Sequence, residues 1–583
     1  MILQLPKVQT FAADKVVEKL SDKLDGEIHF EKIHLKPFTT LVLKNVAIID
    51  KNPVLDPIDS TKAPVDTFFR AEYIIAKFTL NSLLKGESIG LSRVYVSNAQ
   101  MNLVLEDIIE NGQPATFQNL SRIFRIKKNK KKEVNPNEIF RIKEVEINTF
   151  GFALINHKHR KTPHTGMIDW NDLQVKDLCI SGRNLKFKGG VMSGIVDKAS
   201  FREKSGFNCT NLSGQATVGN GKTIVKNLKI KDDYSDITMP LYQMSYANVS
   251  AFSEYITDVK MDAELEESIL DFRTIAFFAN ALKGNTLKLT VSGNASGYVN
   301  NLQFNNIKAS SHAGGFSCVA DGSIVGIPKM ETAVFDGIIR NANITTKGLS
   351  KFVTVWMKDG QMDVSKLAKG YIFTLNGKAK GTLNDMKIKA NLSSLIGKAS
   401  ANITMFNTLS DDPITLDGII STQNLDLGKI LNTDLLGPAT LKAGARASFK
   451  EGANQARIDS LIVDRLMLNK YNYTGIAAAG TLQENTFDGR LICNDPNLSF
   501  LFQGSFALSS KTKNSRYQFY ANIGHADLNK LNIDKRGTSQ IQLQTNANFT
   551  HTSQGDILGK IDLGGITLIN KQGKQKIGDI SLI

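Results

Sequence analysis

The segment Leu375–Met405, with the sequence LNGKAKGTLNDMKIKANLSSLIGKASANITM, decides the fold. Short runs within it alternate apolar residues with small or polar ones, and each run ends at Gly, Asn, Asp or Ser. Met386 and Ile388 fall on one side of an extended chain, whereas Lys387 and Lys389 fall on the other. This period of two, interrupted by turn residues, predicts antiparallel β-strands with one apolar face and one polar face.

Nearly all of the chain after Gly26 repeats this pattern. The 583 residues are 42% hydrophobic and include 45 Gly but only 13 Pro, a composition typical of folded proteins. The segment Tyr246–Leu282 interrupts the alternation, because its apolar residues from Ile269 to Ala279 recur at helical spacing. We therefore expect two short helices to lie across the sheet in this segment.

Weak internal repetition marks some of the turns. The segments Ile419–Ile430 (IISTQNLDLGKI), Ala521–Leu531 (ANIGHADLNKL) and Thr345–Phe352 (TTKGLSKF) each resemble a strand that runs into a one-turn corner containing Lys. Their spacing is too loose for a short-repeat solenoid. The pattern instead indicates a long meander whose turns share similar chemistry.

Patterning divides the chain into four regions. Residues 1–25 carry an amphipathic helix, which either caps the β-core or lies at a membrane interface, and we interpret the region as the exit of a missing membrane anchor. Residues 26–110 form a first β module, and residues 111–138 form a basic polar linker or loop. Residues 139–583 form a repeating β-groove, which we expect to continue beyond the C-terminal end.

The net charge of +15 suits nucleic acid, an anionic lipid surface or an acidic partner. The lysine run Lys127–Lys132 has only Phe124 as an aromatic neighbour, so it lacks the interleaved rings that stack on bases. We therefore predict no nucleic-acid partner. Most other Lys and Arg residues are spread along the strands, where a solvated polar face or contact with lipid headgroups accounts for them.

No catalytic, metal or cofactor site is predicted. The sequence GNGKT at Gly219–Thr223 lacks the first glycine of a phosphate-binding loop and reads as a hairpin turn. His157, His159 and His164 lie in a basic loop that would repel a cation. The four cysteines are far apart, which excludes a zinc site or a disulfide scaffold and favours buried thiols: Cys179, Cys209, Cys318 and Cys493.

Several stretches together resemble a known family. They are LQLPKVQTFAADKVVEKLSDKLDGEIHFEKIHLKPFTTLVLKNVAIID, AEYIIAKFTLNSLLKGESIGLSRVYVSNAQMNLVLE, MIDWNDLQVKDLCISGRNLKF, FREKSGFNCTNLSGQATV and GSIVGIPKM. They are similar to the N-terminal portion of bacterial TamB, in the AsmA-like group of bridge-like lipid carriers, and closest to TamB-like proteins of Bacteroidota-type bacteria. The family's membrane helix and its C-terminal domain, which meets an outer-membrane β-barrel partner, have no counterpart in residues 1–583.

The resemblance implies a mainly β fold: an elongated antiparallel sheet curled into an open U-shaped groove (a β-taco), with an N-terminal amphipathic helix and short accessory helices. It implies a periplasmic protein, anchored to the inner membrane, that moves phospholipid along a hydrophobic groove between the inner and outer membranes. About 25 strands at ~4.8 Å each would give a groove on the order of 100 Å long.

Two other functions stay open. One is a scaffold for the translocation and assembly of outer-membrane or secreted proteins, in which an open sheet edge pairs with client strands. The other, an extracellular β-solenoid enzyme or adhesin, predicts a closed helix with a polar outer groove.

The alternation also gives candidate residues for the lining of the groove, and the parity of each strand is open at this point. They are Leu287, Leu289, Val291, Leu302, Phe304, Phe373, Leu375, Met386, Ile388, Ile403, Met405, Phe500, Phe502 and Phe506.

Overall fold

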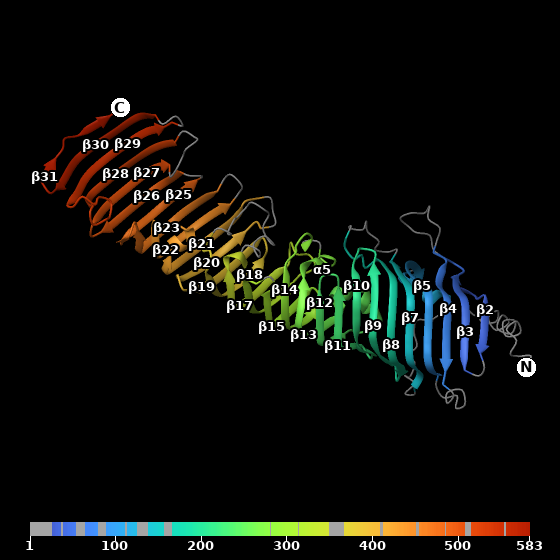
Figure 1. Cartoon of the computed structure of the whole chain (residues 1–583). Helices are drawn as coiled ribbons and strands as arrows, with labels where there is room; N and C mark the ends of the chain where they lie inside the picture. The colour runs from blue at the N-terminus through green and yellow to red at the C-terminus, as the bar shows by residue number, and fades with distance from the viewer. Residues whose placement is uncertain are drawn as a thin grey trace, which may run out of the picture. The chain divides into compact units, whose positions relative to one another are not determined.

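The computed structural model describes residues 26–583 except 37–38, 54–64, 80–88, 111–112, 125–137, 157–165, 280–281, 313, 349–366, 409–411, 450–453, 484–485, 508–514 and 553–555. These residues are mainly strands of one open, largely antiparallel sheet (Figure 1). None of the helices among them is long and apolar enough to cross a membrane. The predicted amphipathic helix of residues 1–25 lies outside the described residues.

The chain divides into two compact units, Met1–Leu302 and Gln303–Ile583. The first unit contains β1 to β14 and the start of β15. Its strands are β1 (Gly26–His29), β2 (Lys32–Lys36), β3 (Thr40–Asp50), β4 (Thr67–Phe78), β5 (Ile89–Glu110), β6 (Gln113–Gln118), β7 (Glu138–Asn156), β8 (Asp172–Lys188), β9 (Val191–Glu203), β10 (Asn208–Gly219), β11 (Lys222–Asp232), β12 (Asp236–Ser245), β13 (Lys260–Asp271), β14 (Lys288–Tyr298) and β15 (Asn301–Ser311).

In the first unit β1 and β2 both pair with β3, which pairs with β4, and β4 pairs with β5. From β7 to β14 each strand pairs antiparallel with the next, whereas β5 and β7 pair in parallel. A parallel pair requires a long return crossing. Part of that crossing is β6, which forms a hairpin with the end of β5, and the short helix α3 (Asn119–Ile123).

The crossing lies in residues 111–138, which the sequence predicts to be a linker or loop. The structure differs for Gln113–Ile123 because α3 is fixed onto β5. The amide of Asn119 donates to the carbonyl oxygen of Asn102 at 2.9 Å, and its oxygen accepts the N–H of Val104 at 3.1 Å. Ile123 is fully buried. The lysine run that follows lies outside the described residues.

The second unit is a meander. Its strands are β16 (Phe316–Val325), β17 (Val334–Thr345), β18 (Ile372–Thr382), β19 (Asp385–Ser394), β20 (Gly397–Phe406), β21 (Ile414–Asp426), β22 (Leu436–Phe449), β23 (Gln455–Leu468), β24 (Tyr471–Tyr473), β25 (Ile476–Gln483), β26 (Thr486–Asp495), β27 (Leu498–Ala507), β28 (Ser515–Asp527), β29 (Ser539–His551), β30 (Ile557–Asn570), β31 (Gly573–Lys576) and β32 (Ile580–Leu582). Each main strand from β16 to β30 pairs antiparallel with the next, β24 and β25 share β23, and β31 and β32 share β30.

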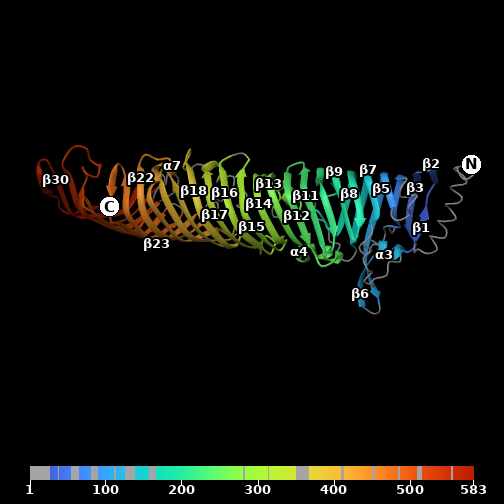
Figure 2. The same cartoon turned by 90° about the horizontal axis from the view of Figure 1, so that it is seen from below.

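Short helices occupy the ends of strands. Between β12 and β13 lie η2 (Val249–Glu254) and α4 (Tyr255–Asp258), seen at the edge of the sheet in Figure 2, and after β13 lies α5 (Phe272–Ala276). Ile269, predicted to share a helix with Phe272, belongs instead to β13. Pairing of β13 with both β12 and β14 outweighs its local helical spacing.

The predicted corner containing Lys is confirmed after β21, where Asp426 caps α7 (Leu427–Leu431) by accepting the N–H of Lys429 at 3.1 Å. The turn after β28 has the same chemistry, because Asp527 accepts the N–H of Lys530 at 3.1 Å. The third predicted corner, Thr345–Phe352, is described only as far as Gly348, whose N–H is accepted by the Thr345 hydroxyl at 3.1 Å.

Glycines inside strands allow neighbouring backbones to approach closely. Gly480, Gly489 and Gly504 lie directly opposite one another on β25, β26 and β27. A Cβ atom on Gly489 would lie 2.3 Å from the carbonyl oxygen of Ala479 and 2.6 Å from the Cα of Gly480. The ring of Phe487 covers both Gly480 and Gly489, so the strands close up under an aromatic side chain.

Substitution of Gly489 tests this close approach. We expect Gly489→Ala to lower the free energy of unfolding by about 2 kcal/mol or more, because the new methyl group forces two strands apart. Urea unfolding followed by circular dichroism measures the change. Gly578→Ala is the control, since its Cβ would meet nothing within 4 Å. Equal midpoints for the two variants would contradict the prediction.

The four cysteines are free thiols. Cys209 and Cys493 are buried, as predicted, whereas Cys179 and Cys318 are half-buried. Burial raises the pKa of the Cys209 thiol to about 11.

This pKa predicts selective alkylation. Raising the thiol pKa from 9.0 to about 11 leaves about 100-fold less of Cys209 as thiolate at mildly alkaline pH. The thiolate is the form that reacts. We expect iodoacetamide to modify Cys179 well before Cys209, as measured by peptide mass spectrometry. Equal rates in the native protein would refute this ordering, and equal rates in urea are the control.

Candidate functional site

The candidate site is an apolar face assembled from cross-strand rows. Directly opposed residues on paired strands project to the same face, so the pairing register traces each row across the sheet. In the second unit a central row extends from β17 to β30 and contains one polar residue, Thr545. Its members are Ile339, Gly377, Ala390, Ala401, Ile420, Ala443, Leu461, Ala478, Leu491, Phe502, Ala521, Thr545 and Leu563.

Three further rows lie on the same face of the second unit. A glycine-rich row consists of Gly322, Gly337, Ala379, Ile388, Ile403, Gly418, Ala445, Ile458, Gly480, Gly489, Gly504, Phe519, Ala547 and Ile561. A second consists of Phe335, Gly381, Met386, Met405, Leu416, Ala447, Ala456, Leu482, Phe487 and Phe506. The third consists of Ala342, Leu375, Leu392, Ala399, Thr422, Leu441, Val463, Ile476, Cys493, Phe500, Ile523 and Leu543.

Asparagine bulges keep these rows apolar where the alternation slips. In β17 the register shifts between Ile339 and Ala342, and Asn341 takes the left-handed conformation with φ of 49°. In β21 the same shift separates Thr422 from Leu425, with Asn424 at φ of 50°. Each bulge inserts one extra residue, which lets residues three apart project to the same face.

The first unit has apolar rows of its own. One extends from β2 to β12 and contains only aliphatic residues: Ile33, Leu43, Ile74, Val96, Ile147, Ile180, Ala199, Leu212, Ile230 and Ile237. A shorter row from β9 to β14 is rich in methionine: Met192, Val218, Thr223, Met244, Met261 and Gly297.

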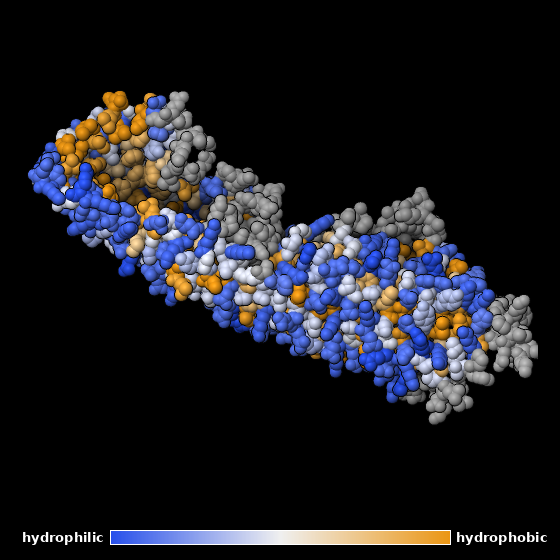
Figure 3. Space-filling view, viewed as in Figure 1, coloured by the Kyte–Doolittle hydropathy of each residue, from blue (hydrophilic) through white to orange (hydrophobic). Residues whose placement is uncertain are grey.

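The opposite face of the sheet is polar. One row on this face of the second unit is Asp336, Lys380, Lys387, Thr404, Asp417, Arg446, Arg457, Thr481, Asp488, Ser505, Gln518, Asn548 and Lys560. Among the described residues no second sheet packs on either face. Figure 3 shows hydrophobic residues gathered in and above a hollow over the last strands, with hydrophilic residues on the surface below it.

The structure brings most of the predicted lining residues of the second unit together. Those that lie on the four rows are Leu375, Met386, Ile388, Ile403, Met405, Phe500, Phe502 and Phe506. Phe373 is buried beside α7. Phe304 is half-buried in β15 and alternates with the exposed Gln303 and Asn305. Phe502 contacts Phe506, with ring centroids 5.1 Å apart.

The other predicted lining residues belong to the first unit. Leu289 and Val291 are buried in β14, and Leu302 is half-buried in β15. Leu287 precedes β14 and lies in the corner that follows α5. Its N–H donates to Asn285 at 2.9 Å, and its carbonyl oxygen accepts the N–H of Phe272 at 2.9 Å.

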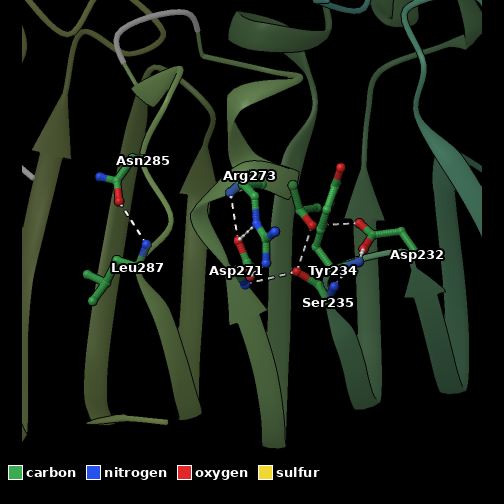
Figure 4. Close-up of polar contacts among 8 residues, drawn as sticks. Asp232, Tyr234, Ser235, Asp271, Arg273, Asn285 and Leu287 are labelled. Atoms are coloured by element: carbon green, nitrogen blue, oxygen red, sulfur yellow. Dashed lines mark hydrogen bonds and ion pairs between the residues drawn. The ribbon is translucent and has the colours of Figure 1, made fainter. Parts of the chain in front are cut away.

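A buried polar network fixes this corner (Figure 4). Asp232 accepts N–H groups from Tyr234 and Ser235, each at 2.6 Å, and Ser235 accepts the N–H of Asp271 at 2.9 Å. Burial opposes ionisation of Asp271, but hydrogen bonds from Arg273 outweigh burial and lower the pKa of this carboxyl group. The hydrogen bonds of Asp232, Ser235 and Asp271 are made within the corner, which indicates a structural role for these three residues.

A cluster of hydroxyl groups interrupts the apolar face of the first unit. The Tyr242 and Tyr255 hydroxyls lie 3.0 Å apart, and that of Tyr255 lies 3.1 Å from the sulfur of Met261. Tyr255 belongs to α4, so this helix extends over the methionine-rich row. Burial raises the pKa of Tyr242, which keeps its hydroxyl neutral. Sequence patterning missed this cluster, because Tyr255 reaches the sheet from a connecting segment.

The corner after β28 closes one end of the apolar face of the second unit. Leu531 is buried against Tyr473, Cys493 and Ala526. Asp495, next to this cluster, accepts the Tyr471 hydroxyl at 2.5 Å and the N–H groups of Thr474 and Asn497, each at 2.9 Å. Burial opposes ionisation of Asp495, but these hydrogen bonds outweigh it and lower the pKa of its carboxyl group.

Asp495 therefore links stability to pH. A lowered carboxyl pKa contributes stability above the unfolded-state value of about 3.9, and that contribution is lost as the pH falls through the folded-state value. We expect Asp495→Asn to cost about 1–3 kcal/mol at neutral pH, because hydrogen-bond donors lose a charged acceptor. Urea midpoints at neutral pH and at about pH 2 measure the difference, which should shrink in acid. A difference independent of pH would contradict this assignment.

Among the described residues, no three His, Cys, Asp or Glu side chains are grouped as metal ligands. The predicted hairpin at GNGKT is confirmed, with Asn220 and Gly221 joining β10 to β11 at φ of 53° and 70°. His157, His159 and His164 lie outside the described residues.

Comparison with models of protein families, with curated proteins and with solved structures gives no match for this chain. Fold and site therefore define the class: an open, two-faced β-sheet with long apolar rows on one face.

Proposed function

We propose that the chain is a non-enzymatic carrier of phospholipid acyl chains, as its resemblance to the TamB and AsmA-like family implies. The observation that supports this best is the continuity of the central row across β17 to β30 of the second unit. In this proposal the sheet curls into a groove whose apolar face is the lining, and the polar face is the outer wall.

The energetics favour a long hydrocarbon ligand. Burying apolar surface contributes about 25 cal/mol per Å², and the rows offer apolar surface that no second sheet covers in the described part of the chain. Ile420, in the middle of the central row, is 45% exposed. A lining of similar aliphatic and aromatic groups lets a chain slide without a large barrier, whereas a single deep pocket would trap it.

Charge and small residues support the same reading. The rows place Gly and Ala among Ile, Leu and Phe, so the face stays apolar from strand to strand. Lys and Arg on the polar face remain in water. The resemblance further places the protein in the periplasm, anchored to the inner membrane, with phospholipid headgroups at the open side of the groove and an outer-membrane β-barrel protein as a possible partner.

The alternative proposal is a scaffold for translocation and assembly of outer-membrane or secreted proteins. The pairing of β30 is the observation that bears on it, because within the described residues β31 and β32 pair with only part of that strand. Ile557 and Leu558, at the start of β30, are 59% and 62% exposed. A client strand adding to this edge would make main-chain hydrogen bonds without entering the apolar rows.

Two adjacent residues of β20 give a matched test. Ile403 lies on the glycine-rich row and Asn402 on the polar face, and changing either residue to Asp adds one negative charge. We expect Ile403→Asp to reduce phospholipid recovered with the purified chain about tenfold, because a carboxylate among hydrocarbon chains is strongly disfavoured. Asn402→Asp should leave recovery unchanged.

Native mass spectrometry and crosslinking to a photoactivatable phospholipid measure recovery, and thermal unfolding confirms that both variants fold. If the wild-type chain carries no phospholipid, or if the two variants carry equal amounts, the carrier proposal is wrong. Crosslinking of unfolded barrel strands along β30, without lipid on the rows, would support the scaffold instead.

A further inference from the structure

The polar face of β18, β19 and β20 carries a concentration of lysines. All five are exposed: Lys378, Lys380, Lys387, Lys389 and Lys398. Lys378 lies directly opposite Lys389, and Lys380 lies directly opposite Lys387. Asp385 is the one acidic residue within these three strands. We call these five side chains the lysine patch.

Like charges placed directly opposite each other on neighbouring strands destabilise a sheet. Elsewhere on the polar face some charged residues form ion pairs, as between Arg183 and Asp197 at 2.9 Å and between Arg446 and Asp417 at 3.8 Å. Within the patch Lys380 pairs with Asp336 at 2.7 Å. Among the described residues, no ion pair joins the other four lysines of the patch to a carboxylate. This arrangement costs stability and concentrates positive charge, which suits an anionic ligand.

A polar hollow lies beside the patch. Asn376, Asn391, Ser400 and Ser421 face one another in a row across β18 to β21. The short serine side chains leave a hollow of about 470 Å³, which Lys398 and Gln423 also line. A second hollow of about 520 Å³ shares Lys398 and Gln423 and continues towards Asp426 and Lys429. Amide and hydroxyl groups, together with Leu392 and Ala399, therefore line a recess that ammonium groups flank.

We propose that this recess binds an anionic glycan, a polyhydroxylated chain carrying carboxylates. Amides and hydroxyls donate to and accept from sugar hydroxyl groups, and ammonium groups attract the carboxylates. The hollow and the lysine patch contain no aromatic side chain, so they lack the stacking surfaces that single-stranded nucleic acids use. The lysine patch and the row of Asn and Ser residues lie on the face opposite the apolar rows. The proposal does not depend on the proposed lipid function.

Binding of a galacturonic acid decamer to the full chain, measured by isothermal calorimetry at several salt concentrations, tests the proposal. We expect Lys378→Gln/Lys389→Gln to weaken binding about tenfold and to reduce the slope of log K against log salt concentration. Asn391→Ala should weaken binding about threefold to tenfold without changing the slope, because it removes neutral hydrogen bonds. The control Lys574→Gln/Lys576→Gln removes the same charge from exposed β31 of the same unit and should leave binding unchanged.

The lysine substitutions relieve repulsion, so these variants should unfold at the same urea concentration as the wild type or higher. Absence of decamer binding would overturn the proposal. Equal binding of a decamer of deoxythymidylate, together with no effect of Asn391→Ala, would also overturn it in favour of general attraction to polyanions. Tighter binding to vesicles of phosphatidylglycerol than to the decamer would assign the patch to a lipid surface instead.

Discussion

The register between neighbouring strands is the constraint on which the rest of the structure depends. A slip of one residue would turn every side chain of a strand to the other face. Ile388 would then face solvent, and Lys389 would lie among the apolar rows. Left-handed asparagines such as Asn341 and Asn424 preserve the faces where the alternation slips. The apolar rows therefore stay continuous across many strands because the register is kept at each pair of neighbouring strands.

An open sheet of this kind is stabilised differently from a closed core. Each strand buries only part of its apolar surface, against its two neighbours, and two clusters of buried residues lie at corners, near Leu425 and Leu531. Polar groups such as Asp495 and Asp271 hold these corners in place through buried hydrogen bonds. Between the corners, glycines let neighbouring backbones approach closely, and among the described residues no second sheet covers the apolar side.

Much of this fold could be predicted from the sequence, because period-two alternation is local. The strand pattern of Leu375–Met405 and the hairpin at Gly219–Thr223 follow directly from residue types. Other features depend on contacts distant in the chain. The parallel pair of β5 and β7 requires a crossing that composition presents as a linker, and Tyr255 reaches Tyr242 only after the intervening segment folds back. The contribution of Ala and Gly to the rows is visible only through pairing.

The two faces of the sheet are under unequal physical constraint. A charge on the apolar face would lose hydration, which costs several kcal/mol, so only residue size and shape can vary there. Two lysines about 5 Å apart on the solvated face repel by only about 1 kcal/mol. Lys378 and Lys389 can therefore face each other without unfolding the sheet. Since both faces share the same strands, selection for a specific polar ligand can act on the lysine side while the apolar rows on the other side stay unchanged.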